Sequence, residues 1–218
     1  MPHMRVLMDD MPCELDTATI GRALAAAAAH AAGRGRIIVD VFIDGERWAG
    51  DSFAGREEAS LVAHELRFVS SNPGALVAQA LTDSEEALHE ADELQRQAAQ
   101  LIQCDDMAAA LESLGQAIGL WTNVQQAIID GAALLGLTLD SVQVGEEGIA
   151  AIIHRLNQRL HSLKRSLQAR DPVTLADTLL YDMPEVVDEW QGVLAAMRDR
   201  IRQDEVRCEH AGEPGSSL

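Results

Sequence analysis

Aromatic residues and cysteines are both scarce in this chain. Phe, Trp and Tyr make up 3% of the 218 residues, whereas apolar residues make up 47%. A core with so few rings has to be built from Ala, Leu, Ile and Val, which favours closely packed helices over a sandwich of aromatic-rich strands. The three cysteines are widely spaced and form no zinc or Cys-x-x-Cys pattern. We therefore interpret them as free thiols in a reducing compartment and expect a cytoplasmic protein.

Positive charge is also scarce. Lys and Arg number 17 against 35 Asp and Glu, which gives a formal net charge of −18. Such a surface repels nucleic acids and anionic membranes. The alanine-rich run at residues 25–29 is too short to span a bilayer, and the N-terminus does not resemble a signal peptide. We accordingly expect neither a nucleic-acid partner nor a membrane partner.

Recognisable catalytic and cofactor motifs are missing. The sequence contains no Gly-x-Ser-x-Gly, no phosphate-binding loop and no Gly-x-Gly-x-x-Gly, so it predicts neither catalytic residues nor a cofactor. Glu86 and His89 have the Glu-x-x-His spacing of di-iron helical bundles, but a complete site needs a second such motif. His154 and His161 share one helix face without a carboxylate. A solvated helix face explains Glu86 and His89 better than a metal site does.

Residues 1–72 predict a small α/β domain made of one sheet and one helix. Short apolar or alternating runs at residues 5–8, 37–43, 47–48 and 65–69 are typical of strands. Asp44-Gly45 is a hairpin-turn pair between two of them. Asp16-Thr17 offers a helix N-cap, and Gly33 offers a helix end. We expect the helix to cross one face of the sheet.

Residues 73–206 predict four amphipathic helices with short connections, so the expected fold class is α+β. Apolar residues recur every three or four positions and favour either a four-helix bundle or two stacked helical hairpins. The expected stripe of the second helix runs through Leu111, Leu114, Ile118, Trp121, Gln125, Ile128, Ala132 and Leu135. That of the fourth runs through Leu175, Leu179, Met183, Val186, Trp190, Leu194, Met197 and Ile201. Residues 207–218 are polar, with Gly, Pro and Ser, and are expected to be a disordered tail.

Charge is unevenly distributed among the expected helices. Residues 76–103 hold six acids and one arginine, whereas residues 149–170 hold five bases and no acid. The negative first helix and the positive third helix are therefore expected to be neighbours or dimer partners. Pro184 lies inside the fourth helix, close to the only tyrosine, Tyr181. It bends the helix with the bundle, breaks it into two shorter helices, or shapes a ligand pocket.

These observations favour a non-enzymatic protein-interaction module, such as an adaptor, an assembly factor or a secretion-type chaperone. Long apolar stripes and an open sheet edge are surfaces that bind protein chains. The expected partner is another protein or a second copy, which makes a homodimer a possibility. We expect Trp48, Arg155 and Arg159 to contact it. The alternatives are a metal-binding bundle enzyme that uses Glu86, His89, His154 and His161, and a small-ligand sensor with a pocket beside Pro184.

Overall fold

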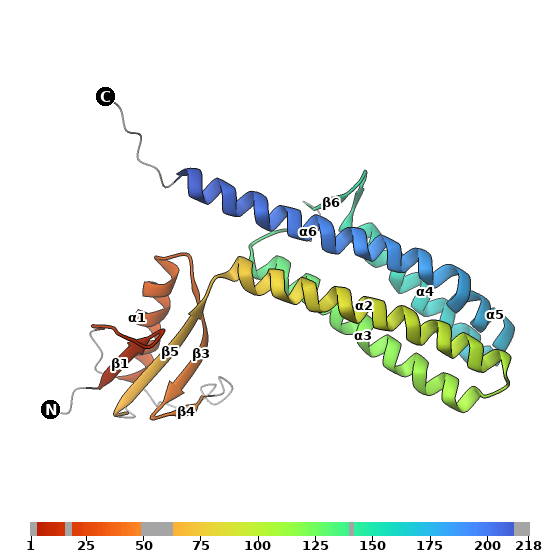
Figure 1. The fold of residues 1–218 in the computed structure, drawn as a ribbon, viewed down its shortest axis with the longest axis horizontal. Coiled ribbons are helices and arrows are strands. Elements are labelled where there is room, and N and C mark those ends of the chain that lie inside the picture. The colour runs from red at the N-terminus through yellow and green to blue at the C-terminus, as the bar shows by residue number, and fades with distance from the viewer. Residues whose placement is uncertain (1–3, 16–18, 49–62, 140–141, 212–218) are drawn as a thin grey trace. The chain divides into compact units, whose positions relative to one another are not determined.

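The α+β class is confirmed. The computed structural model describes residues 4–15, 19–48, 63–139 and 142–211, with side chains as far as residue 203. The chain divides into two compact units, Met1–Leu76 and Val77–Leu218, which we call the N-terminal unit and the helical unit. A five-stranded sheet with one helix forms the first, and helices dominate the second (Figure 1).

The sheet of the N-terminal unit mixes parallel and antiparallel pairs. Its strands are β1 (Arg5–Met8), β2 (Met11–Pro12), β3 (Ile37–Ile43), β4 (Glu46–Arg47) and β5 (Glu65–Ser71). They lie in the order β2-β1-β5-β3-β4, and β5 pairs in parallel with β1 and antiparallel with β3. The strands predicted at residues 5–8, 37–43 and 65–69 are confirmed, whereas β2 was not predicted. Both edge strands among the described residues have only two residues, and each pairs with two residues of its neighbour.

The turn between β3 and β4 forms where the sequence placed it. Asp44 and Gly45 have φ angles of 50° and 89°, the left-handed pair that a two-residue hairpin turn requires. The Asp44 carboxylate also accepts hydrogen bonds from the backbone N–H groups of His64 and Glu65, at 2.9 and 2.8 Å. A single turn residue thus ties the hairpin to the start of β5.

Helix α1 (Ile20–Ala32) packs against β3 and β5. It begins after Thr19, whose hydroxyl accepts a hydrogen bond from the backbone N–H of Arg22; the N-cap expected at Asp16-Thr17 falls outside the described residues. Gly33 caps its C-terminus, as predicted. The buried residues recur every three or four positions and are Ile20, Ala23, Ala27 and Ala31. Their small side chains let the helix approach the sheet closely.

The helical unit is a four-helix bundle with one core. Its long helices are α2 (Pro73–Gln103), α3 (Met107–Leu134), α4 (Ile149–Ala169) and α6 (Met183–Ala211). The short helix α5 (Pro172–Asp177) and the π-helical segment η4 (Thr178–Asp182) lead into α6. A small hairpin of β6 (Gln143–Val144) and β7 (Glu147–Gly148) joins α3 to α4. The tail was predicted from residue 207, whereas α6 continues to Ala211 and residues 212–218 fall outside the described part.

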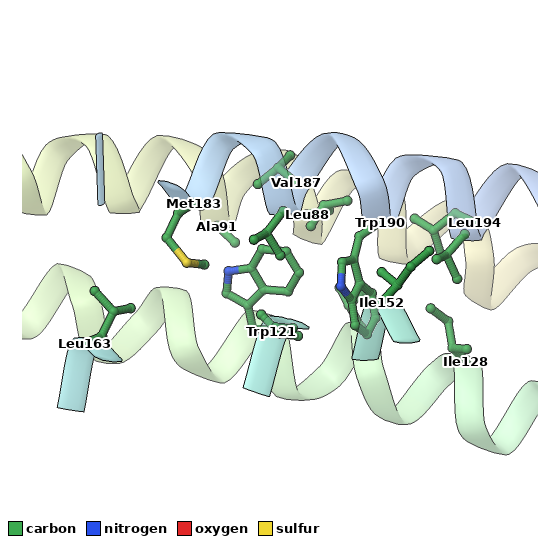
Figure 2. Close-up of a cluster of buried hydrophobic side chains, with 14 of the residues drawn as sticks. Leu88, Ala91, Trp121, Ile128, Ile152, Leu163, Met183, Val187, Trp190 and Leu194 are labelled. Atoms are coloured by element: carbon green, nitrogen blue, oxygen red, sulfur yellow. The ribbon is translucent and has the colours of Figure 1, made fainter. Parts of the chain in front are cut away.

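Two tryptophans lie at the centre of this core. The rings of Trp121 and Trp190 are 5.6 Å apart between centroids and meet edge to face at 84°. Figure 2 shows them between α3 and α6, with Leu88, Ile152 and Val187 nearby. Because Trp121 and Trp190 come from different predicted hairpins, the hairpins share a single core.

The predicted core stripe is confirmed for the fourth helix and partly wrong for the second. All eight residues expected to be buried along α5, η4 and α6 are buried. On α3, Leu114, Trp121 and Ile128 are buried, but Leu111 and Ile118 are 47% and 39% exposed. The reason is that α3 is apolar on two adjacent faces, so its periodicity does not reveal which face the bundle covers.

The bend expected near Pro184 takes the form of a π-helical turn. Pro184 has no N–H to donate to the carbonyl of Leu180, four residues earlier. The preceding residues adopt the wider π register, in which the Met183 N–H donates to the Thr178 carbonyl. Leu179 stays buried on one side of this turn, and Tyr181 is 69% exposed on the other.

Candidate functional site: the basic face of helix α4

Helix α4 concentrates the positive charge of an acidic protein. Its core-facing residues are Ile149, Ile152, Leu156, Leu163 and Ser166, which are buried at helical spacing. The remaining positions carry the cations Arg155, Arg159, Lys164 and Arg165, and the helix ends at Arg170, whose φ of 54° is left-handed. With no acid between residues 149 and 170, the outer surface of α4 is positive along its length.

Arg155 and Arg159 bind carboxylates within the chain. Arg155 donates to Glu147 of β7 at 2.6 Å and to Glu189 of α6 at 3.0 Å. These hydrogen bonds, led by the one to Glu147, raise the pKa of the Arg155 guanidinium above its ordinary value. Arg159 donates to Asp182, at the end of the π turn, at 3.2 Å. Both arginines therefore fasten α4 to its neighbours in the bundle.

The acidic first helix makes a different pair from the expected one. On α2, Glu85 bonds to Arg198 of α6, whereas the arginines of α4 bond to β7, η4 and α6. The carboxylates that pair with the cations of α4 therefore include one on the last long helix, α6.

The outer part of the basic face has fewer internal partners. Within the described residues, Lys164, Arg165 and Arg170 have no carboxylate partner, and Arg165 donates only to the Ser162 hydroxyl, at 3.2 Å. A shallow groove on α4 includes Arg165 of these three cations, together with the paired Arg155 and Arg159. Its other lining residues are His154, Asn157, Gln158, His161 and Ser162. The groove thus offers exposed cations, imidazoles and amides to an anionic group.

Trp48 belongs to the N-terminal unit. Its backbone N–H donates to the Val41 carbonyl at 2.8 Å, and its partly buried ring packs against the core of that unit. Arg155 and Arg159 lie about one turn apart on one face of α4. The structure thus brings the two arginines together, while the role of all three residues in binding a partner stays a prediction.

The three histidines of the hypothetical metal site, which also included Glu86, have other contacts. His89 lies 3.4 Å from Glu93, His154 contacts Gln158, and the His161 ring contacts the carbonyl of Asn157. Across the ranges that the structure describes, no group of three or more His, Cys, Asp or Glu residues is placed to hold a metal ion. Cys13 and Cys104 are free, and the Cys208 side chain lies beyond the described ones.

A polar cluster in the N-terminal unit was not anticipated. Asp9, with a left-handed φ of 50°, accepts hydrogen bonds from the Ser70 backbone N–H at 2.7 Å and from its hydroxyl at 2.6 Å. Arg36 donates to the Ser70 hydroxyl and carbonyl at 2.7 and 2.6 Å. The bonds from Ser70 hold the pKa of Asp9 below its usual range. This cluster joins the segment after β1 to β5 and to the start of β3.

Comparison with protein-family models, with curated proteins and with solved structures gave no match to this chain. Among the described residues, no helix is both long and apolar enough to cross a bilayer.

Proposed function

We propose that the protein is a non-enzymatic interaction module, of the adaptor, assembly-factor or secretion-chaperone kind. Its basic face on α4 binds an acidic segment of a partner protein. The observation that carries this proposal is the concentration of cations on one helix of a chain with a net charge of −18. Lys164, Arg165 and Arg170 have no carboxylate partner in the described part of the chain, so an acidic segment would supply it.

An acidic peptide suits this face better than a nucleic acid does. The groove on α4 has no Phe, Trp or Tyr among its lining residues, whereas single-stranded nucleic acids bind mainly by stacking on such rings and along extended basic channels. A long polyanion also meets the acidic remainder of the protein. A short acidic segment senses mostly the charges within the Debye length, about 8 Å at physiological salt.

The test uses a fluorescent peptide of alternating Glu and Ala, titrated with the full chain and followed by anisotropy. We expect saturable binding that weakens as salt is raised, because exposed charges are screened. The double variant Lys164→Glu/Arg165→Glu reverses two exposed cations and should weaken binding by about tenfold or more. The Arg22→Glu and Arg34→Glu double variant makes the same charge change in the N-terminal unit and should bind like the wild type.

Three outcomes would overturn the proposal. The peptide could fail to bind, or the two double variants could lose affinity equally, which would point to net charge alone. Tighter binding of a single-stranded RNA of equal charge would replace the acidic segment with a nucleic acid. Circular dichroism of each variant confirms that the helices are intact.

A further inference from the structure

Helix α3 carries two apolar seams, and the bundle covers only one of them. The inner seam is buried and consists of Ala110, Leu114, Ala117, Trp121, Val124 and Ile128. A second seam is formed by the residues that directly follow those of the inner seam, so it has the same alternating spacing of four and three. We call it the outer seam, and it consists of Leu111, Gly115, Ile118, Thr122, Gln125 and Ile129. Its large apolar residues are 47%, 39% and 38% exposed at positions 111, 118 and 129.

Two glycines beside these exposed residues have no explanation among the residues that the structure describes. A Cβ on Gly115 or Gly119 would meet nothing within 4 Å, although each glycine in a helix interior destabilises it by roughly 0.5–1 kcal/mol relative to alanine. The other interior glycines of the helical unit are different, since a Cβ on Gly131 or Gly192 would lie 2.9 Å from a valine side chain. Gly115 and Gly119 therefore point to close approach by something outside this chain.

We infer that a second copy of this chain covers the outer seam, with the two α3 helices antiparallel about a two-fold axis. The spacing of four and three is that of helices packed knobs into holes. The two-fold axis crosses α3 at the level of Leu120. Each seam residue therefore faces the residue of the second copy whose number, added to its own, gives 240. Leu111 then faces Ile129 of the second copy, Gly115 faces Gln125, and Ile118 faces Thr122. In both of these inner layers a smaller residue packs against a larger one: Gly115 against Gln125, and Thr122 against Ile118.

The distribution of charge also favours a second copy of the chain as the partner and the antiparallel direction of the two helices. Two copies with a net charge of −18 repel each other, but residues 113–129 include no charged side chain. In the antiparallel arrangement the flanking acid, Glu112, comes level with Ile128 of the second copy, with Gln126 on the same flank, so it meets no acid there. Gly119 lies one residue from the level of the axis, so the two copies of this glycine come near each other there. The neutral seam thus lets two acidic proteins meet.

The size of the seam sets the strength of the expected dimer. From Leu111 to Ile129 the helix rises about 27 Å at 1.5 Å per residue. One helix pair of this length stays below the roughly 1,200 Å² typical of stable complexes, so the contact belongs to the weak, reversible class. We therefore expect a monomer–dimer equilibrium with a dissociation constant on the order of micromolar to tens of micromolar.

Charge exchange across the seam tests both the surface and its direction. Sedimentation equilibrium is measured for the full chain and two double variants, at loadings from about 1 to about 500 μM, which bracket the expected constant. The variant Leu111→Lys with Ile129→Lys places like charges in the outermost layers and should weaken the dimer by about tenfold or more. The variant Leu111→Lys with Ile129→Glu places opposite charges there and should dimerise within about threefold of the wild type.

The same two double variants also serve as controls for the effect of net charge and for the relative direction of the two helices. The Lys/Lys variant has a net charge of −18 + 2 = −16, so general repulsion alone would make it associate more readily. A parallel dimer would place position 111 opposite itself, and the Lys/Glu variant would then be as weak as the Lys/Lys variant. Val173→Lys changes an apolar residue that is 68% exposed on α5 and should leave the equilibrium unchanged.

The inference is overturned if the wild type stays monomeric over the whole range, or if the Lys/Lys variant dimerises as well as the wild type does. Equal weakening of the two double variants would exclude the antiparallel pairing. None of the substituted residues lies on α4, so these results are separate from those for the acidic peptide.

Discussion

Gln95 of α2 holds the indole of Trp121 by a buried hydrogen bond inside the bundle. The Trp121 Nε1–H donates to the Gln95 Oε1 at 2.8 Å, and the two residues are 1% exposed. The amide oxygen satisfies a donor that the core would otherwise leave unpaired, whereas the Gln95 Nε2 is itself buried without a hydrogen-bond partner among the described residues. The bond fixes the tryptophan that packs edge to face on Trp190.

Removing this acceptor should destabilise the bundle measurably. Gln95→Ala leaves a buried N–H unpaired and opens a cavity, so we expect the free energy of unfolding in urea to fall by about 2–4 kcal/mol. In a double-mutant cycle with Trp121→Phe, the second substitution should cost about 1 kcal/mol less in the Gln95→Ala background, because no donor is then orphaned. Additive effects would show that the hydrogen bond contributes nothing.

The glycines of α3 should respond to alanine in opposite ways. At about 1 μM, where a dimer in the expected range is largely dissociated, Gly119→Ala should stabilise the chain by about 0.5–1 kcal/mol, since its Cβ meets no atom of the chain within 4 Å. Gly131→Ala places a Cβ 2.9 Å from Val77 Cγ1 and should destabilise by about 1–3 kcal/mol. Urea unfolding measures both. Destabilisation by Gly119→Ala at this concentration would mean that the chain itself needs that glycine.

The two helices with tryptophan show what periodicity predicts and what it leaves open. The stripe through Leu179, Trp190 and Met197 was predicted correctly because these apolar residues share one face. On α3, the predicted stripe was wrong at Leu111 and Ile118, because the seam that the bundle buries runs one residue earlier and is itself apolar. Which of two such seams is buried depends on the neighbouring helices, and that information is not local to α3.

The candidate site was predictable as a region but not residue by residue. The positive charge of α4 is evident in the sequence, and Arg155 and Arg159 were singled out there as partner contacts. The structure shows that Arg155 bonds to Glu147 and Glu189, which are distant from each other in sequence. Sequence alone could not separate this internally paired arginine from Arg165. The Gln95–Trp121 bond was missed for the same reason.

The polar cluster around Asp9 should make the N-terminal unit sensitive to acid. Because Ser70 lowers the pKa of Asp9 in the folded state, the unfolded state binds the proton more readily. The stabilisation is therefore fully present at a pH above the pKa that Asp9 has in the unfolded state. It is lost as the pH falls through the lower pKa that Asp9 has in the folded state. Asp9→Asn should be less stable than the wild type at about pH 7 and should converge with it at about pH 2.

Convergence is measured by thermal unfolding, with the N-terminal unit followed by fluorescence of a dye attached at Cys13 or by hydrogen exchange of β5. Asp10→Asn is the matched control, since Asp10 is 78% exposed and pairs with Arg67 at 3.3 Å. A parallel offset between Asp9→Asn and the wild type at every pH would show that the carboxylate charge is not the source of the stabilisation.

Arg155 and Arg165 should separate the internal role of α4 from its proposed external one. Arg155→Ala leaves Glu147 and Glu189 without their shared cation and should lower the stability of the bundle by about 0.5–1 kcal/mol, a value reduced by solvent screening of these partly exposed groups. Arg155→Lys should recover little of it, because a single ammonium does not reproduce the fork of the guanidinium. Arg165→Ala has no carboxylate to release among the described residues and should leave urea unfolding unchanged, while it weakens binding of the acidic peptide. If Arg155→Ala weakened peptide binding more than Arg165→Ala did, at equal helix content, then the internally paired arginine would be the one that contacts the partner.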